Sequence, residues 1–268
     1  MDTNRADKAA EEYKKVIDLD PSDKWLLMEV ERRLAELAMS SGKIEKAIDI
    51  YDDLIKRYSG DPQSIINLYM NKINLYRQNN RGADAKKTLD EAIALTNGRG
   101  DLEAQLLVMQ AQIHMEEGNL DEAGAVYQKV LKRKGAEQWA TCDAERGLAE
   151  IALNRNQVDE AVEIYSGLIE KYSETPQFLM NLYEGMVNAK IKAGRQNQAI
   201  NICKEGIDKL ENYPDDLARL FFMLGNIYMD TNRADKAAEE YKKVIDMKIN
   251  DRWVVHEAKR RLEEMNIQ

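Results

Sequence analysis

An alanine that recurs at a constant interval is the feature that most constrains the fold of this chain. Seven alanines follow one another at intervals of 38 residues, with no insertion or deletion between them: Ala9, Ala47, Ala85, Ala123, Ala161, Ala199 and Ala237. A fixed internal period of this length is typical of arrays in which each repeat is a small unit that packs on its neighbours. The chain is therefore expected to form a repeat array rather than a domain with one central core.

The position four residues after each alanine usually holds a large side chain. These residues are Tyr13, Tyr51, Leu89, Tyr127, Tyr165, Cys203 and Tyr241. A spacing of four residues places two side chains on the same face of a helix. Alanine lets a neighbouring helix approach closely, and the larger residue fills the groove beside it. Each alanine therefore predicts a helix, called helix B below.

Polar breaks precede the B helices, and an apolar stripe at helical spacing precedes the breaks. The breaks are Ser41-Gly42, Asn79-Asn80, Glu117-Gly118, Ala193-Gly194 and Thr231-Asn232. The stripe is seen in Leu34, Ala35 and Ala38, and it predicts a second helix, helix A. Residues suited to helix starts precede the stripes: Asp23, Asp61-Pro62, Thr175-Pro176 and Pro214-Asp215. The sequence thus predicts an all-α array of antiparallel A and B helices.

The seventh repeat carries the pattern that identifies the array by resemblance. Its residues Leu224-Gly225, Tyr228, Ala237, Tyr241 and Val244 have the spacing of the tetratricopeptide repeat, and Pro21 stands where the first repeat would close. The chain resembles this family along essentially its whole length. The resemblance implies a right-handed superhelical solenoid of antiparallel helix pairs, with about six full repeats and a partial repeat at each end.

The sequence departs from the common pattern of the family in three respects. The period is 38 residues, where the common unit has about 34. Most repeats lack the signature Trp, and Gly225 alone supplies the signature Gly. We interpret the four extra residues as one more turn on helix A.

A longer period divides the array into blocks. Trp25, Trp139 and Trp253 are spaced by 114 residues, which is three times 38. We predict one continuous array over residues 1–268, made of a partial repeat (1–27), two three-repeat units (28–141 and 142–255) and a terminal partial repeat (256–268). In addition, Met1–Asp18 is identical to Met229–Asp246.

The predicted helix order begins with a helix B and finishes with a helix A, which leaves two interpretations open. The chain is either a piece of a longer array or an array whose terminal helices act as caps, as the polar residues Glu257, Lys259, Glu263 and Glu264 suggest. Alternatively, the last helix A of one molecule pairs with the first helix B of another. That head-to-tail self-association would produce open filaments.

Composition and motifs exclude several classes of function. A net charge of −9 opposes binding to nucleic acid, whose phosphates attract Lys and Arg. No window has the apolar length of a membrane span, and the polar residues after Met1 show no signal peptide, so a soluble chain is expected. Its compartment stays open, because a targeting segment could lie outside a fragment.

No catalytic or metal-binding constellation is recognisable in the sequence. Cys142 and Cys203 lack metal-ligand spacing and are expected to be structural. His114 and His256 lie near no nucleophile or paired carboxylate in a catalytic spacing. We therefore expect a protein that is not an enzyme and uses no cofactor.

The family resemblance also indicates where a partner would bind. In arrays of this kind the A helices line a concave groove, and groove residues occupy positions two, five, six and nine of a repeat that begins nineteen residues before its alanine. The candidate partner-binding residues are Asn67, Met70, Asn71, Asn74, Gln105, Met109, Gln112, Asn181, Asn188, Arg219, Phe222, Met223 and Asn226. Position nine is a carboxamide in four of six repeats.

Carboxamides both donate and accept hydrogen bonds, so a row of them could satisfy the backbone of an extended peptide. Met and Phe would add adaptable apolar contacts. The leading hypothesis is a non-catalytic scaffold that binds an extended or helical segment of a partner protein in the groove. The alternative is a structural or self-assembling array, and the carboxamides would then only keep the surface soluble or link neighbouring repeats.

The family variant that clamps a C-terminal carboxylate is not expected here, because no window supplies its set of Lys, Asn and Arg. The basic groove candidates are Arg32, Arg33, Arg146, Arg219, Arg260 and Arg261. Most have Glu36, Glu150 or Glu264 one turn away, so their charge is expected to be neutralised within the helix.

Overall fold

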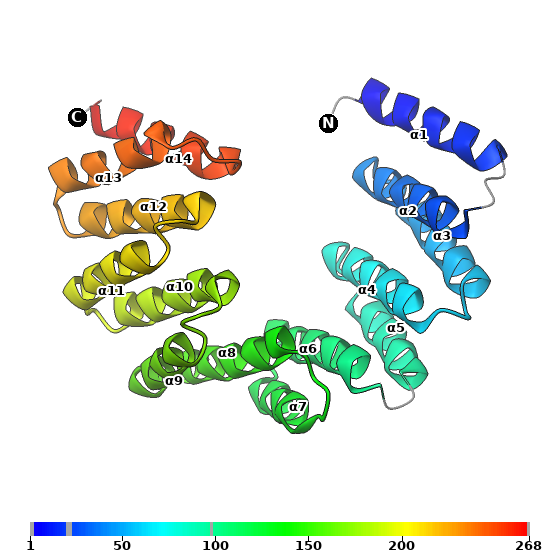
Figure 1. Cartoon of the computed structure of the whole chain (residues 1–268), viewed down its shortest axis with the longest axis horizontal. Helices are drawn as coiled ribbons and strands as arrows, with labels where there is room; N and C mark the ends of the chain where they lie inside the picture. The colour runs from blue at the N-terminus through cyan, green and yellow to red at the C-terminus, as the bar shows by residue number, and fades with distance from the viewer. Residues whose placement is uncertain (1–2, 20–22, 97–98, 267–268) are drawn as a thin grey trace. The chain divides into compact units, whose positions relative to one another are not determined.

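The described residues form α-helices joined by short turns (Figure 1). The structure is a computed structural model that describes residues 3–19, 23–96 and 99–266. Within these ranges there are fourteen helices and no strand. This confirms the all-α class predicted from the sequence, while Pro21 lies outside the described residues.

Helices alternate between the two predicted types. The B helices are α1 (Thr3–Asp18), α3 (Ile44–Arg57), α5 (Gly82–Leu95), α7 (Leu120–Lys132), α9 (Val158–Lys171), α11 (Gln196–Lys209) and α13 (Ala234–Asp246). The A helices are α2 (Lys24–Ser40), α4 (Pro62–Gln78), α6 (Gly100–Glu116), α8 (Gln138–Asn154), α10 (Pro176–Lys192), α12 (Pro214–Asp230) and α14 (Arg252–Asn266). Each of the seven alanines lies on a B helix, as the period predicts. The A helices from α2 to α12 have 17 residues, whereas α3 to α13 have 13 or 14.

Side-chain caps fix the starts of three A helices, α2, α4 and α14. On α14 the Asp251 carboxylate accepts hydrogen bonds from the N–H groups of Trp253 and Val254, at 3.0 and 3.2 Å. The Asp23 carboxylate accepts hydrogen bonds from the N–H groups of Trp25 and Leu26, at 2.9 and 3.2 Å. Asp61 accepts one from the N–H of Gln63 at 3.2 Å. These bonds satisfy backbone donors that have no partner inside the first helical turn.

One backbone arrangement closes every described turn from a helix A to the following helix B. The turn residues have φ between 56 and 78° and are Gly42, Asn80, Gly118, Asn156, Gly194 and Asn232. The next N–H donates to a carbonyl five residues back, as Lys43 does to Ala38 and Arg233 to Tyr228, both at 2.8 Å. Glycine and asparagine tolerate this left-handed conformation best, so they recur every 38 residues. Asn156 belongs to the series although it is not among the predicted polar breaks.

The chain divides into two compact units. The first contains the described residues up to Ile113 together with Lys132–Glu137, and the second contains His114–Leu131 together with the described residues from Gln138 onward. In the first unit, α1 to α5 pack in chain order around a core that includes Leu54 and Ile66. The division into three-repeat units stays a prediction.

In the second unit the A helices form a closely packed layer. Helices α8 to α14 pack in chain order, and α10 also contacts both α8 and α12, while α12 contacts α14. In Figure 1, α10 and α12 lie on one side of this unit and α9, α11 and α13 on the other. On the side of the second unit formed by the A helices, the A helices of neighbouring repeats are therefore in direct contact.

Candidate peptide-binding surface

Three A helices carry a pair of carboxamides at the second and ninth positions of their repeats. The pairs are Asn67 and Asn74 on α4, Gln105 and Gln112 on α6, and Asn181 and Asn188 on α10. Seven residues span two helical turns, or roughly 10.5 Å. Each pair therefore presents two amides on one helical face, with Asn67, Asn181 and Asn188 exposed and the other three half-buried.

The predicted carboxamides differ in whether they already have a partner. Asn74 accepts a hydrogen bond from Arg77 at 3.3 Å, and Asn226 accepts one from the Tyr241 hydroxyl at 2.7 Å. The Asn74 amide is thus paired within α4, whereas the Asn226 amide links α12 to α13. By contrast, Asn181 and Asn188 make no hydrogen bond to any residue that the structure describes. The α10 pair is thus available to a partner.

A pocket of about 490 Å³ contains both of these asparagines. Its lining comes from three consecutive helices of the second unit and consists of Arg146, Glu150, Leu153, Tyr165, Asn181, Glu184, Gly185 and Asn188. A Cβ on Gly185 would lie 2.4 Å from the Tyr165 ring, so only glycine lets α10 rest directly on that ring. Tyr165, Glu184 and Gly185 line the pocket but are not among the predicted partner-binding residues.

Ion pairs order the charged side chains of the pocket. Arg146 contacts Glu150 and lies 3.2 Å from Asp143, and Arg219 lies 2.8 Å from Glu184. Burial alone would lower the pKa of Arg146, but Glu150 and Asp143 outweigh it and raise that pKa. Arg146 is therefore a permanent cation shared by two carboxylates.

Tyr165 is a buried residue of the pocket lining that carries a hydroxyl group. Tyr165 is 1% exposed, and its hydroxyl makes no hydrogen bond to the described part of the chain. Burial, followed by the neighbouring Glu150, raises the pKa of this phenol, so it stays protonated. A neutral hydroxyl can both donate to and accept from a bound group.

Two predicted groove residues belong to the core instead. Met109 is 6% exposed and lies in the core of the first unit. Phe222 is 8% exposed, and its ring centroid lies 5.7 Å from that of Tyr241 and 6.1 Å from that of Trp253. Both side chains fill space between packed helices, and their contact with a partner stays a prediction. Met70, Asn71, Met223 and Arg219 are half-buried.

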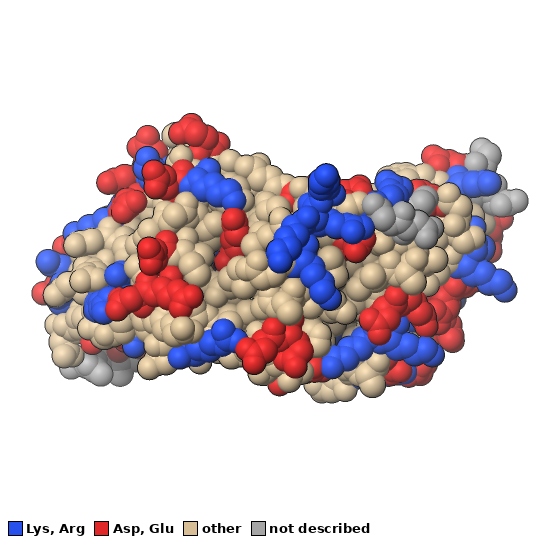
Figure 2. Space-filling model, turned by 90° about the horizontal axis from the view of Figure 1, so that it is seen from below, with Lys and Arg blue, Asp and Glu red and all other residues tan. Residues whose placement is uncertain are grey.

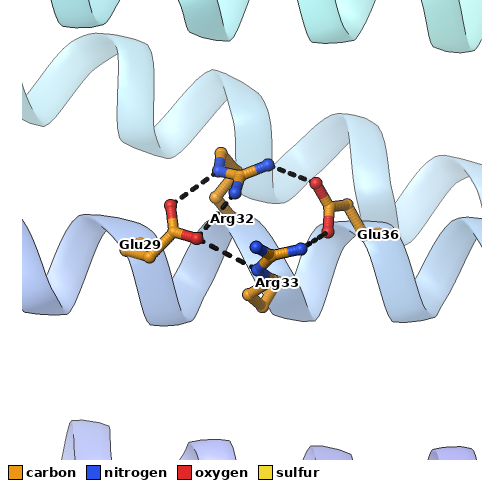
Figure 3. Close-up of polar contacts among 4 residues, drawn as sticks. All are labelled: Glu29, Arg32, Arg33 and Glu36. Atoms are coloured by element: carbon orange, nitrogen blue, oxygen red, sulfur yellow. Dashed lines mark hydrogen bonds and ion pairs between the residues drawn. The ribbon is translucent and has the colours of Figure 1, made fainter. Parts of the chain in front are cut away.

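The expected neutralisation of the groove arginines is confirmed. On α2, Arg32 and Arg33 each pair with both Glu29 and Glu36, which closes a ring of four charges (Figure 3). Arg146 pairs with Glu150 on α8, and Arg260 with Glu264 on α14. On the face drawn in Figure 2, acidic and basic side chains are likewise interspersed, apart from one group of Lys and Arg near its middle.

The two thiols are unsuited to nucleophilic chemistry. Cys142 and Cys203 are both buried, and burial raises the pKa of Cys142 to about 11 and that of Cys203 to about 12. The reactive thiolate is therefore scarce at neutral pH. Among the described residues, no group of three or more His, Cys, Asp or Glu side chains could hold a metal ion, and no helix is long and apolar enough to cross a membrane.

Family models match most of the chain. A model described as the tetratricopeptide repeat protein 21 ARM repeat matches residues 55–168, and two models described as the tetratricopeptide repeat match residues 1–64 and 218–249. No curated protein matches the sequence significantly.

Solved structures share the fold at low sequence identity. A tetratricopeptide repeat protein from Parabacteroides merdae is 19% identical, with a TM-score of 0.61 over 96% of this chain and 93% of that chain. A signal transduction ATPase with numerous domains and a tetratricopeptide repeat sensor, from Pyrococcus horikoshii, is 16% identical, with a TM-score of 0.59 over 89% of this chain and 40% of that one. Together with the helix pairs and their motif, these matches show that the chain belongs to the tetratricopeptide repeat family, whose repeats generally mediate protein–protein interaction.

Proposed function

We propose that this protein is a non-catalytic scaffold that binds an extended segment of a partner protein on the A-helix face of its second unit. The observation that carries the proposal is the pair of unpaired, exposed amides of Asn181 and Asn188 in one pocket. Their helical separation of roughly 10.5 Å matches about three residues of an extended chain. Two amides at this spacing can hold the backbone of a peptide without reading its side chains.

Binding can be measured with a displayed library of linear twelve-residue peptides selected on the intact protein. The affinity of the selected peptides is then compared for the Asn181→Ala/Asn188→Ala variant and for a control, Gln198→Ala/Asn201→Ala. The control removes two exposed carboxamides from α11, a B helix. We expect the first variant to bind roughly tenfold more weakly, since two neutral hydrogen bonds contribute about 1–3 kcal/mol together.

The control variant should bind the peptides as the unmodified protein does, and both variants should keep the helical circular dichroism. If the selected peptides bind the Asn181→Ala/Asn188→Ala variant with unchanged affinity, the proposed binding site is wrong. A helical ligand would show instead as apolar residues enriched at intervals of three and four in the selected peptides.

The surface of α14 argues against the alternative of head-to-tail stacking. Helix α14 repeats the sequence pattern of α2 at a displacement of 228 residues, as Arg260 and Arg261 repeat Arg32 and Arg33. Ala35 is fully buried in the core that α2 shares with α3, but its equivalent on α14 is the exposed Glu263. A further B helix would bury that carboxylate without a partner, which is costly. Light scattering that shows mass rising with concentration would support stacking nevertheless.

A further inference from the structure

The charged groups on α2, α8 and α14 form three versions of the same arrangement. Glu29, Arg32, Arg33 and Glu36 on α2 recur after 228 residues as Glu257, Arg260, Arg261 and Glu264 on α14. In these two helices two arginines balance two carboxylates. At the intermediate displacement of 114 residues, α8 carries Asp143, Arg146, Gly147 and Glu150. Here one arginine faces two carboxylates, so one negative charge is unbalanced.

The missing arginine on α8 has a steric cause. A Cβ on Gly147 would lie 2.2 Å from the Tyr127 ring, so no side chain fits between α8 and α7 at this position. The helix packing thus removes a guanidinium that the two related helices retain. Because α8 lies so close to Tyr127 of α7, residue 147 cannot carry a positive side chain. The excess negative charge on α8 is therefore not neutralised by a residue at this position.

The unbalanced carboxylate lies in the pocket that contains the unpaired asparagines. Among the lining residues, Glu150 and Glu184 are negative and Arg146 alone is positive. Beyond the lining, Asp143 pairs with Arg146 and Arg219 pairs with Glu184, which leaves the same excess. Lys192 lies outside the lining, where its exposed ammonium donates to the Leu153 carbonyl at 2.5 Å. The Glu150 and Glu184 side chains are 39% and 38% exposed, so both carboxylates can be reached.

We infer that this pocket accepts the cationic side chain of an arginine or lysine carried by the extended partner segment. The inference rests on the proposed function and adds to it the class of partner, a basic segment. The entering cation would supply a positive charge equivalent to that of Arg33 on α2 and Arg261 on α14, which α8 lacks. Glu150 and Glu184 would pair with its charge, and the unpartnered Tyr165 hydroxyl on the pocket floor would accept one of its hydrogens.

Charge complementarity favours this occupant over an acidic one. Arg146 is already shared by two carboxylates, so it offers an incoming anion little attraction. The net charge of −9 also increases the rate at which a basic segment reaches the protein. The apolar part of the lining is limited to Leu153 and the covered Tyr165 ring, which suits the aliphatic stem of a long cationic side chain.

The same displayed library tests this inference through the composition of the selected peptides. We expect Arg or Lys to be enriched at one fixed position. Replacing that residue by norleucine in a synthetic copy of the peptide should weaken binding roughly tenfold. The Glu150→Gln/Glu184→Gln variant should lose the preference for the cation, whereas Glu163→Gln, an exposed residue of the B helix α9, should retain it.

The outcomes separate this inference from the proposed function. Peptides that favour acidic or apolar residues, yet still lose affinity for the Asn181→Ala/Asn188→Ala variant, would overturn the cation site and leave the groove in place. Peptides that depend on neither the asparagines nor the glutamates would overturn both. A preference for Arg or Lys that survives Glu150→Gln/Glu184→Gln would place the cation elsewhere and also contradict the inference.

Discussion

Helix α1 contains the whole sequence of helix α13, but the two helices have different surroundings. Met1–Asp18 is identical to Met229–Asp246. In α13, which packs against both α12 and α14, Ala237, Tyr241 and Val244 are fully buried. Their equivalents in α1, which packs against α2, are only half-buried. Glu240 is 7% exposed, whereas its equivalent Glu12 is exposed.

The comparison separates what the local sequence determines from what the neighbours determine. Both copies form a helix, so the sequence of the segment and packing against one neighbouring helix are sufficient for helix formation. Burial follows from the number of helices that flank the segment. In a repeat array, stability is approximately a sum of repeat and nearest-neighbour contributions. Identical substitutions should therefore have unequal effects in the two helices.

The largest difference is expected for Tyr241→Ala against Tyr13→Ala. The Tyr241 ring lies against Gly225 and Phe222, and its hydroxyl donates to Asn226. Its removal should cost about 3–5 kcal/mol, whereas removal of the half-buried Tyr13 should cost less than half as much. Amide hydrogen exchange of each helix measures the local free energy of opening without assuming two-state unfolding. Equal losses in α1 and α13 would contradict the role of the flanking helices.

A second variant perturbs the surroundings of α13 and leaves its sequence unchanged. A Cβ on Gly225 would lie 2.6 Å from the Tyr241 ring, so Gly225→Ala should destabilise α12 and α13 by about 1–3 kcal/mol. Exchange in α1 should not change. Gly60→Ala is the matched control, because a Cβ there meets nothing within 4 Å. Combined with Tyr241→Ala, the Gly225→Ala penalty should largely disappear, and additive penalties would show that the two groups do not clash.

The substitutions Val244→Ala in α13 and Val16→Ala in α1 compare the two helices with a smaller loss of side-chain volume. Val244 is fully buried, so loss of two methyl groups should cost about 1–2 kcal/mol, and Val16→Ala about half of that. The readout is again amide exchange, this time in the last turn of each helix. A larger loss at Val16 than at Val244 would reverse the expected order.

The smallest difference between the two helices is expected for the ion pair of Glu240 with Lys243 in α13 and the equivalent pair of Glu12 with Lys15 in α1. Glu240 lies 2.8 Å from Lys243 and is buried, whereas Glu12 pairs with Lys15 in solvent. Glu240→Gln should cost about 1 kcal/mol, while Glu12→Gln should leave α1 unchanged. Because solvent and salt screen the exposed pair, added salt should not alter the α1 result. A salt-dependent loss in α1 would mean that this pair does stabilise the helix.

Much of the fold could be predicted because it repeats. The alanine period located every helix B, and the Gly and Asn breaks located the turns, since both depend on local backbone and packing rules. Gly147 and Gly185 were missed, because each contacts a tyrosine twenty residues earlier, in the preceding repeat. Their role follows from contact between repeats and is absent from the motif of a single repeat.

The candidate site was predicted only in part. Asn181 and Asn188 follow from the register of the repeat, but the availability of their amides depends on which residues surround them. Asn226 lies at the repeat position equivalent to Asn188, but its amide oxygen already accepts a hydrogen bond from the Tyr241 hydroxyl. Likewise, Met109 and Phe222 occupy predicted groove positions but turn into the core, because the packing of adjacent helices decides which positions face solvent.

The left-handed residue that closes each A-to-B turn also bears on how such a gene can change. Because Gly42, Asn80, Gly118, Asn156, Gly194 and Asn232 occupy equivalent places, a recombination between any two of them would delete or duplicate a whole number of helix pairs. The new junction would have the same backbone geometry as the old ones. Copy number could therefore vary by unequal crossing-over without selection for a new linker.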